Sequence, residues 1–299
     1  MNLPSGIKIN NLIDDLRIFS WEASEILLNY AQILKDPNNK SNILENGNIQ
    51  DPVTKADLQV NELIIQKLNQ KYKGTDWGIL SEENVKSGCE KFVSNYDWNW
   101  VLDPLDGTKD FIQGTGDYSM HLSLNHMQKP YLGVVLIPEK DELWISNGEK
   151  VWCENKKRSK YKTECYRKKS LREMILVTSK NHRNKNLKFL IEKLHVYQVK
   201  VMGSIGCKIA SIIRGESDIY ICLSLPGKSS PKDWDFSAPE VILKGSGGSI
   251  TDIHNRELSY GNNNHEQGGV IIASNNNLLH KDLCLQIKEI IKKYNLYPL

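Results

Sequence analysis

The sequence predicts a mixed α/β fold, and three patterns within its 299 residues support this. Apolar side chains recur at helical spacing over residues 9–34, alternate along residues 120–124, and form short runs separated by helix-like segments over residues 174–223. The first pattern indicates an amphipathic helix, the second antiparallel strands, and the third a series of α/β units. Periodicity by itself shows only that helices and strands are mixed.

In the first half of the chain, the helix over residues 9–34 is followed by a polar, asparagine-rich linker over residues 35–50. A second helix is expected after Asp57, because the apolar side chains that follow it have helical spacing. The aromatic run of residues 98–102 predicts a strand that carries Asp103 to its carboxyl end. We expect the antiparallel strands that follow at residues 120–124, 134–137, 143–146 and 151–153.

The second half alternates strand-like and helix-like segments. Strands are expected at residues 174–178, 196–202, 219–223, 249–253 and 269–273, and helices at residues 185–194, 207–214 and 278–294. A further helix begins at Asp235 and is closed by Gly245, Gly247 and Gly248. We expect two lobes: residues 1–153 form an α+β lobe that binds metal, residues 170–299 form an α/β lobe, and residues 154–169 form a basic loop between them.

Composition gives little indication of a large charged partner. The net charge of +3 is the small difference between 39 basic and 36 acidic residues, so no global field favours nucleic acid or a membrane. The six cysteines form no Cys-x-x-Cys pair and are expected to be reduced. No stretch approaches the ~20 apolar residues of a membrane span. We therefore expect a cytoplasmic monomer or homodimer that acts on a small molecule and binds neither nucleic acid nor membrane.

The segment Asp-Pro-Leu-Asp-Gly-Thr-Lys-Asp (residues 103–110) places two carboxylates three positions apart, at the end of the aromatic strand. Closely spaced carboxylates repel one another unless a cation binds between them. Hard oxygen ligands of this kind suit Mg²⁺. Asp106 folds back toward Asp103 after a proline turn, Gly107 lets the backbone approach an anion, and Thr108 stands at a helix start. Metal and phosphate together indicate phosphoryl chemistry. Taken alone, the motif also fits an ordinary Asp-Pro turn with an Asp N-cap.

Three other acidic clusters fall at the ends of expected elements. Asp57 opens a helix, Glu82 and Glu83 stand where an apolar stretch meets a loop, and Asp235 opens another helix. Each could be a helix cap or a surface pair. Four such clusters in one chain are harder to explain as four separate caps, which favours a shared site.

In order, residues 51–272 contain Asp-Pro-Val-Thr-x-Ala-Asp, Ser-Glu-Glu, Asp-Pro-Leu-Asp-Gly-Thr-Lys-Asp and Trp-Asp-x-x-Ala-Pro-Glu. This order resembles the magnesium-dependent, lithium-sensitive superfamily of inositol monophosphatases. Lys109 and residues 234–254 are most similar to 3'(2'),5'-bisphosphate nucleotidases, which belong to sulfur metabolism. Inositol phosphatases usually have Thr-Asn where this chain has Lys109-Asp110. The resemblance implies a layered α-β-α-β-α sandwich of the inositol monophosphatase and fructose-1,6-bisphosphatase type.

The resemblance also implies roles for individual residues. The metal ligands would be Glu82, Asp103, the carbonyl of Leu105, Asp106 and Asp235, holding two or three Mg²⁺ ions. The catalytic residues would be Asp57 and Thr108, which orient and deprotonate the attacking water, together with Glu82. Substrate would be bound by Gly107, Thr108, Ser179, His182, Gly206, Lys208 and Asp235. Glu83 would hold an outer-shell water.

The implied reaction is attack of a metal-activated water on the 3'(2')-phosphate of adenosine 3'(2'),5'-bisphosphate, which gives AMP and phosphate without a covalent phosphoenzyme. Lys208 and His182 would contact the second phosphate or the ribose. The residues leave simpler interpretations open, since a helical lysine usually reaches solvent and an exposed loop histidine is ordinary. One alternative function is an inositol or other sugar-phosphate phosphatase. A second is a non-catalytic phosphonucleotide-binding protein, although none of the five acidic residues is missing. No role is assigned to residues 113–119.

Overall fold

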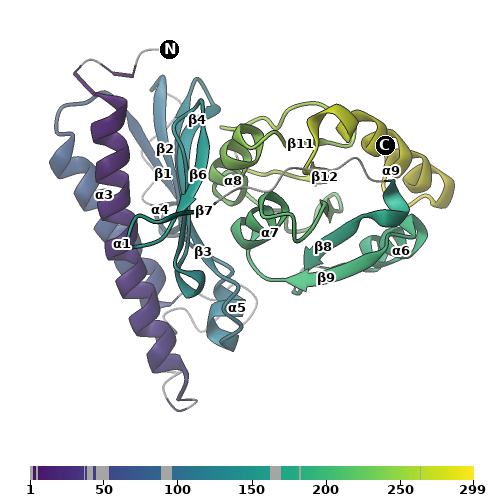
Figure 1. Cartoon of the computed structure of the whole chain (residues 1–299), viewed down its shortest axis with the longest axis horizontal. Coiled ribbons are helices and arrows are strands. Elements are labelled where there is room, and N and C mark those ends of the chain that lie inside the picture. Colours follow the sequence, from purple (N-terminus) through teal and green to yellow (C-terminus); the bar gives the residue numbers. More distant parts are fainter. Residues whose placement is uncertain are drawn as a thin grey trace.

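The fold has five layers, helix, sheet, helix, sheet and helix, as expected (Figure 1). It is seen in a computed structural model that describes residues 3–4, 6–36, 38, 43–44, 54–88, 96–161, 170–181, 183–262 and 264–299. Most of the linker predicted for residues 35–50 falls outside these ranges, as do residues 162–169 of the basic loop and His182.

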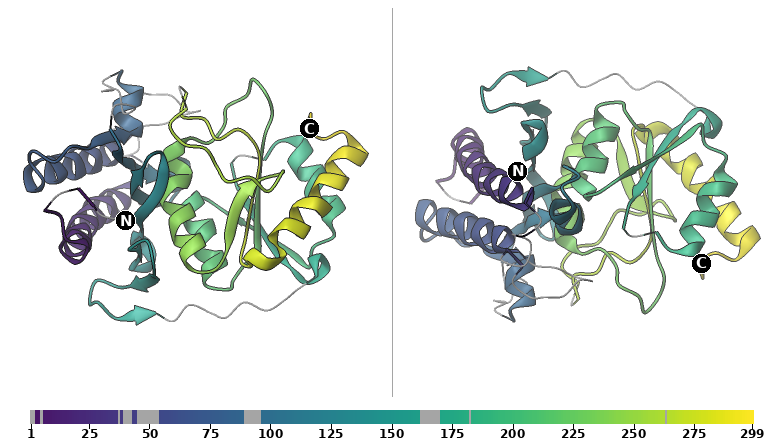
Figure 2. Two further views of the ribbon diagram at one scale, coloured as in Figure 1. Left: turned by 90° about the horizontal axis from the view of Figure 1, so that it is seen from above. Right: turned by 90° about the horizontal axis from the view of Figure 1, so that it is seen from below.

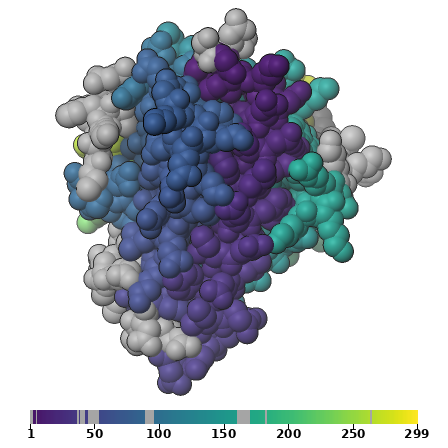
Figure 3. All heavy atoms as spheres, turned by 90° about the vertical axis from the view of Figure 1, so that its left-hand side faces the viewer, coloured from purple at the N-terminus to yellow at the C-terminus, as the bar shows by residue number. Residues whose placement is uncertain are grey.

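The first layer consists of helices α1 (Ile9–Leu34) and α3 (Lys55–Lys71), which lie side by side (Figure 3, purple and blue). Each buries one stripe of apolar side chains at helical spacing, as the sequence predicts, and the stripes face the first sheet. Lys67 bridges to Glu22 with an Nζ to Oε2 distance of 2.6 Å. Helix α1 has the bounds that its apolar period predicts.

The first sheet has seven strands in the order β1-β2-β3-β4-β5-β6-β7. Strand β1 pairs parallel to β2 and every other neighbouring pair is antiparallel. Its strands are β1 (Gly78–Ser81), β2 (Trp98–Asp106), β3 (Ser119–His126), β4 (Lys129–Ile137), β5 (Glu142–Ser146), β6 (Val151–Glu154) and β7 (Lys160–Tyr161). Between them lie α4 (Glu82–Lys86), α5 (Thr108–Gln113) and the 3₁₀ turn Pro138–Lys140. The predicted antiparallel strands are confirmed.

Strand β2 is buried along its whole length, because α3 packs on one side of the sheet and α8 on the other. This burial explains its continuous aromatic and apolar run. The expected loop at Glu82 is wrong: Glu82 is the first residue of the short helix α4. Residues 160–161, expected in the basic loop, pair with β6. The division into two lobes remains a prediction.

The second sheet has five strands in the order β11-β12-β10-β8-β9. Strand β8 is parallel to β9 and β10, whereas β12 is antiparallel to β10 and β11. The strands are β8 (Ile175–Ser179), β9 (Gln198–Met202), β10 (Ile219–Ser224), β11 (Ser249–Asp252) and β12 (Gly269–Ser274), preceded by the 3₁₀ turn Leu171–Glu173. Helices α6 (Lys185–Leu194) and α9 (Asn277–Tyr294) cover its outer face. The predicted alternation of strands and helices is confirmed.

Helices α7 (Ile205–Ile213) and α8 (Asp233–Gly245) form the layer between the two sheets (Figure 2, green). All nine residues of α7 are buried, because sheets lie on both sides of this layer. The four cysteines among the described residues are free, namely Cys153, Cys207, Cys222 and Cys284. Among the described helices, none has a stretch long and apolar enough to span a bilayer.

His280 fastens the outer helix α9 to the second sheet. Its Nε2 lies 2.8 Å from Thr251 Oγ1 on β11, and its Nδ1 lies 2.7 Å from Ser274 Oγ on β12. Burial lowers the pKa of His280 from 6.5 to about 4. The folded protein therefore keeps this ring neutral over a pH range in which the unfolded chain protonates it.

This difference predicts that His280 makes stability depend on pH. Because the unfolded state binds the proton first, the free energy of unfolding falls as the pH drops from 6.5 toward 4, by up to about 3 kcal/mol from this residue. Urea unfolding of the wild type and of His280→Gln, which cannot titrate, isolates the contribution. We expect their difference in stability to shrink as the solution is acidified. A difference that stays constant between pH 7 and pH 4.5 would contradict the prediction.

Candidate active site

Three carboxylates from two separate parts of the chain meet between the sheets. Asp103 and Asp106 stand at the end of β2, and Asp235 lies in the first turn of α8. One oxygen from each lies within 4.8 Å of the others. The pairing of β2 with β3 shifts register between Asp103 and Asp106, so both side chains reach the same place. Three of the residues that the family resemblance implies as metal ligands therefore lie close together, and their role as ligands remains a prediction.

Burial is the main cause that raises the pKa of Asp103 and Asp235 well above the usual value. Neighbouring negative charge adds to the shift, from Glu82 and Asp106 in both cases. Glu82 is close enough to hydrogen-bond with Asp103. Buried acids that repel one another in this way, with only hard oxygen donors, fit a divalent cation.

Asp106 is oriented by the first turn of α7. Its Oδ2 accepts hydrogen bonds from Ser204 Oγ at 2.6 Å, from the backbone N–H of Ile205, and from the N–H of Gly206 at 3.1 Å. His121 Nε2 on β3 lies 3.3 Å from the same oxygen. Because Oδ2 is fully occupied, Oδ1 remains available to a cation.

Gly206 lets α7 approach β3 this closely. A Cβ at this position would lie 2.4 Å from both His121 Nε2 and Ser119 Oγ. The backbone N–H of Gly206 donates a hydrogen bond to Asp106. The expected contact of Gly206 with substrate remains a prediction. Sequence reasoning did not identify the roles of Ser204 and His121. Ser204 could have been recognised as a helix N-cap, since its hydroxyl accepts from Cys207 N at 3.1 Å.

Asp57 lies at the start of α3, but Thr54 is the N-cap residue. Asp57 Oδ2 accepts hydrogen bonds from Thr54 N at 2.8 Å and from Thr54 Oγ1 at 2.6 Å, which forms a capping box. The simpler interpretation of Asp57 as the N-cap is therefore wrong. Burial raises the pKa of Asp57 to about 8. The negative charges of Glu83 and Glu82 also raise this pKa, whereas the hydrogen bonds from Thr54 lower it.

Thr108 stands beside Asp57, as expected from the sequence. Its Oγ1 lies 3.0 Å from Leu105 O and 3.4 Å from Asp57 Oδ1. A hydroxyl has one proton and donates to one acceptor at a time, so the shorter contact favours Leu105. Gly107 precedes Thr108 with a φ of 89°, a left-handed conformation that glycine adopts readily.

Glu82 carries its own counter-ion. Lys86 Nζ lies 2.8 Å from Glu82 Oε1 and 3.5 Å from Glu83 Oε1. Lys86 was missed, although the Glu to Lys spacing of four residues on a helix signals such a pair. A cation that binds Glu82 competes with this lysine.

Lys208 points into the protein, so the interpretation that it reaches solvent is wrong. Its side chain on α7 is buried, its Nζ donates to Ser204 O at 2.8 Å, and its Nζ lies 5.3 Å from the centre of the Tyr220 ring. Burial lowers the pKa of Lys208, whereas the negative charge of Asp106 raises it and offsets part of this effect. Ser179, at the end of β8, hydrogen-bonds with Tyr220. His182 lies outside the described residues.

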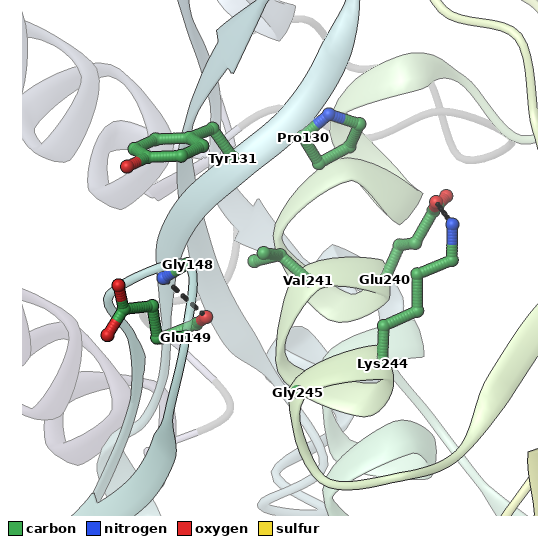
Figure 4. Close-up of a pocket in the computed structure, with 9 residues that line it drawn as sticks. Pro130, Tyr131, Gly148, Glu149, Glu240, Val241, Lys244 and Gly245 are labelled. Carbon is green, nitrogen blue, oxygen red and sulfur yellow. Dashed lines mark hydrogen bonds and ion pairs between the residues drawn. The ribbon is translucent and has the colours of Figure 1, made fainter. Parts of the chain in front are cut away.

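A pocket of about 400 Å³ lies elsewhere, between β4, the β5–β6 turn and α8 (Figure 4). Its polar groups include the ion pair of Lys244 with Glu240, at 2.7 Å. No predicted site residue lines it. Its lining consists of Pro130, Tyr131, Ser146, Gly148, Glu149, Glu240, Val241, Lys244 and Gly245.

Residues 15–292 match the model of the inositol monophosphatase family. A 3'(2'),5'-bisphosphate nucleotidase CysQ of Buchnera aphidicola is 31% identical over 209 residues, which is 70% of this chain and 74% of the relative.

Among solved structures, CysQ of Bacteroides thetaiotaomicron aligns with a TM-score of 0.65 at 24% identity, covering 88% of this chain and 95% of the other. An inositol monophosphatase of Thermotoga maritima aligns with a TM-score of 0.69 at 20% identity, covering 95% and 98%. These two likenesses show the shared fold. The family match over nearly the whole chain, together with the similarity to the Buchnera enzyme, shows that this protein belongs to the inositol monophosphatase family of phosphatases.

Proposed function

We propose that this protein is a Mg²⁺-dependent 3'(2'),5'-bisphosphate nucleotidase that converts adenosine 3'(2'),5'-bisphosphate into AMP and phosphate. The choice of substrate rests on Lys208, a buried lysine that is joined to the acid cluster through a single residue, Ser204. Ser204 joins the two, because its hydroxyl donates to Asp106 and its carbonyl accepts from Lys208. The relative that is 31% identical carries the same activity in its name.

Lys208 has hydrogen-bonding capacity to spare for a ligand. An ammonium group has three donors, and within the described part of the chain one acceptor, Ser204 O, lies within hydrogen-bond distance. A buried cation with unused donors is unfavourable, and a phosphate oxygen would satisfy it. An inositol monophosphate has no second phosphate to fill this position.

Glu82, Asp103, the Leu105 carbonyl, Asp106 and Asp235 would hold the Mg²⁺ ions. The three clustered aspartates fit this role because they are closely spaced oxygen ligands, and burial raises the pKa of two of them, Asp103 and Asp235. Bound Mg²⁺ would supply positive charge to the reacting phosphate and lower the pKa of the attacking water. Gly107 and Thr108 would hold the scissile phosphate.

Asp57 and Thr108 would orient and deprotonate the water. Asp57 lies 3.4 Å from Thr108 Oγ1, and burial makes its carboxylate bind a proton more strongly than an exposed aspartate does, with a pKa of about 8, which suits a general base. Thr108 is held between Leu105 O and Asp57, so its hydroxyl has a defined direction. Direct attack by water requires no phosphorylated side chain.

A second candidate is an inositol or other sugar-phosphate phosphatase. It is favoured by the fold shared with solved inositol monophosphatases, and it would use the same acid cluster. Lithium inhibition, a role in sulfur metabolism and a cytoplasmic location follow from the family resemblance and are part of the proposal.

A substrate panel tests the proposal directly. With Mg²⁺ present, we expect phosphate release from adenosine 3',5'-bisphosphate with a kcat/KM at least about tenfold above that for inositol 1-phosphate, since one good polar contact contributes this factor. Chromatography should identify AMP as the nucleoside product. Hydrolysis of inositol 1-phosphate without hydrolysis of the bisphosphate would establish the second candidate instead.

Lys208→Met tests the recognition of the second phosphate while keeping a long apolar stem in the core. We expect KM for adenosine 3',5'-bisphosphate to rise by roughly 10–100-fold, the value of a hydrogen bond to a charged group. KM for p-nitrophenyl phosphate, which has one phosphate, should change little. Lys200→Met removes a partly exposed lysine on β9, whose Nζ donates to Glu216 O at 2.6 Å, and serves as the control. Equal effects on both substrates would remove Lys208 from the recognition site.

Asp235→Asn tests the metal site. We expect turnover to fall by at least about 100-fold, because a ligand to the reacting metal is lost. In EDTA its melting temperature should equal or exceed that of the wild type, since repulsion with Asp106 and Glu82 is relieved. The rise in melting temperature on adding Mg²⁺ should disappear. Glu257→Gln, an exposed acid with a 64% accessible side chain, should retain both properties. Turnover like that of the wild type in Asp235→Asn would refute the metal assignment.

A further inference from the structure

The chain just after β2 contacts two loops that emerge from the second sheet. We name residues 110–117, which include the end of α5, the latch segment. One loop follows β8 and contains Lys180 and Asn181, and the other follows β9 and begins at Gly203. Residues 113–119 had no assigned role from the sequence, and these contacts give one to Gln113 and Asp117.

Three hydrogen bonds join the latch segment to the two loops. Asn181 Nδ2 donates to Asp110 Oδ2 at 2.9 Å, and Lys180 Nζ donates to Gln113 Oε1 at 2.7 Å. The backbone N–H of Gly203 donates to Asp117 Oδ2 at 3.2 Å. Sequence separations of 67 to 86 residues show that these are contacts between distant parts of the fold.

Asp110 is the anchor of the latch segment. Its side chain is buried, with 3% of its surface exposed, and its other oxygen, Oδ1, accepts from Thr115 Oγ1 at 3.2 Å. Leaving a buried carboxylate without a hydrogen-bond partner destabilises the fold. The hydrogen bond from Asn181 therefore contributes more free energy than an ion pair between exposed side chains. Lys180, whose side chain is 42% exposed, adds less.

The packing around Asp110 is also tight. A Cβ on Gly203 would lie 2.3 Å from Asp110 Cγ and 2.6 Å from Asp117 O, so only glycine fits there. The loop after β9 therefore cannot move toward the latch segment, and the hydrogen bond from its N–H opposes movement away from it. The position of this loop relative to the end of β2 is defined from both directions.

The two loops carry the groups that the proposed substrate needs. Lys180 and Asn181 directly follow Ser179, and Gly203 directly precedes Ser204, whose carbonyl holds Lys208. Two members of the acid cluster, Asp103 and Asp106, lie at the end of β2, just before the latch segment in the chain, and Asp106 also contacts Ser204 directly. We propose that the latch segment, acting together with the Ser204 bridge between Asp106 and Lys208, sets the distance between the acid cluster and the Ser179 and Lys208 groups, and so selects substrates with two phosphates. This inference rests on the proposed nucleotidase function.

Asp110, Asn181 and Asp117 are thus positioning residues, which act through the loops and do not touch substrate. Their loss should weaken binding of a ligand that spans both regions. It should leave binding of a single phosphate at the acid cluster unchanged. This division separates the proposal from a general structural role, which would affect both substrates.

The test compares Asn181→Ala, Asp110→Ala and Asp110→Asn. The asparagine variant keeps an acceptor for Asn181 and a donor to Thr115, so it should behave as the wild type. For Asn181→Ala and Asp110→Ala we expect KM for adenosine 3',5'-bisphosphate to rise about fivefold, the factor of one net hydrogen bond. KM for p-nitrophenyl phosphate and both kcat values should stay within about twofold. Asn186→Ala, which removes a bond of 2.7 Å from Asn186 Nδ2 to Leu296 O far from the latch segment, is the control.

Amide hydrogen exchange provides a readout that needs no substrate. Residues 175–181 and 198–204 should exchange faster in Asn181→Ala and Asp110→Ala than in the wild type, and at the wild-type rate in Asp110→Asn and Asn186→Ala. If the wild type does not hydrolyse the bisphosphate, the proposed function fails while the exchange rates still decide whether the latch segment holds the loops. Unchanged exchange, or equal increases in KM for both substrates, would overturn the proposal. Asn181 is exposed, so its variant should fold even if Asp110→Ala does not.

Discussion

Asp103, Asp106 and Asp235 place three carboxylate oxygens within 4.8 Å of one another inside the protein. Burial first, and repulsion from neighbouring carboxylates second, raise the pKa of Asp103 and Asp235, so the charged form of these two side chains is costly without a cation. Backbone donors offset part of this cost. Leu105 N lies 3.0 Å from Asp103 Oδ1, and Lys232 N lies 2.6 Å from Asp235 Oδ2. A divalent cation would offset the remaining cost. The carboxylates are thus already in position before a cation binds.

The middle helix layer makes this arrangement possible. The first turn of α7 supplies the donors that hold Asp106, and the first turn of α8 supplies Asp235 itself. Both helices are packed between two sheets, so neither can shift without disturbing a large apolar core. His121 links Asp106 on β2 to α8, since its Nε2 lies 3.3 Å from Asp106 Oδ2 and its Nδ1 lies 3.2 Å from Trp234 O, one residue before Asp235. The position of the acids is therefore a property of the whole fold.

In the proposed function, the groups that react with the phosphate and the groups that select the substrate come from different parts of the site. The first sheet and its helices contribute Asp57, Glu82, Asp103, Asp106 and Thr108, which lie around the reacting phosphate in the proposed function. The second sheet contributes the environment of Lys208, including Tyr220 on β10. Burying a lysine is costly, and here the cost is offset by Ser204 O, by the face of Tyr220 and by the charge of Asp106.

Sequence alone determined the elements and the chemistry of the acidic motifs. The apolar period predicted α1 and α6 with their observed bounds, because one buried stripe on an amphipathic helix is a local property of the chain. The motif at residues 103–110 predicted an acidic site at a strand end, since its carboxylates are neighbours in sequence. The resemblance of the ordered motifs to a phosphatase family implied the layered sandwich before any contact was known.

Only the tertiary structure decided what depends on distant neighbours. A capping pattern at Thr54 and Asp57 is visible in the sequence, but the rise in the pKa of Asp57 comes from burial and from Glu82 and Glu83. The sequence could not predict where the side chain of Lys208 points. Apolar residues occur on nearly every side of α7, so their spacing does not identify the side that faces Tyr220. The contacts of residues 110–117 join positions 67 to 86 residues apart, and periodicity carries no information about such pairs. Local patterns identify which side chains are buried, whereas packing decides which side chains they meet.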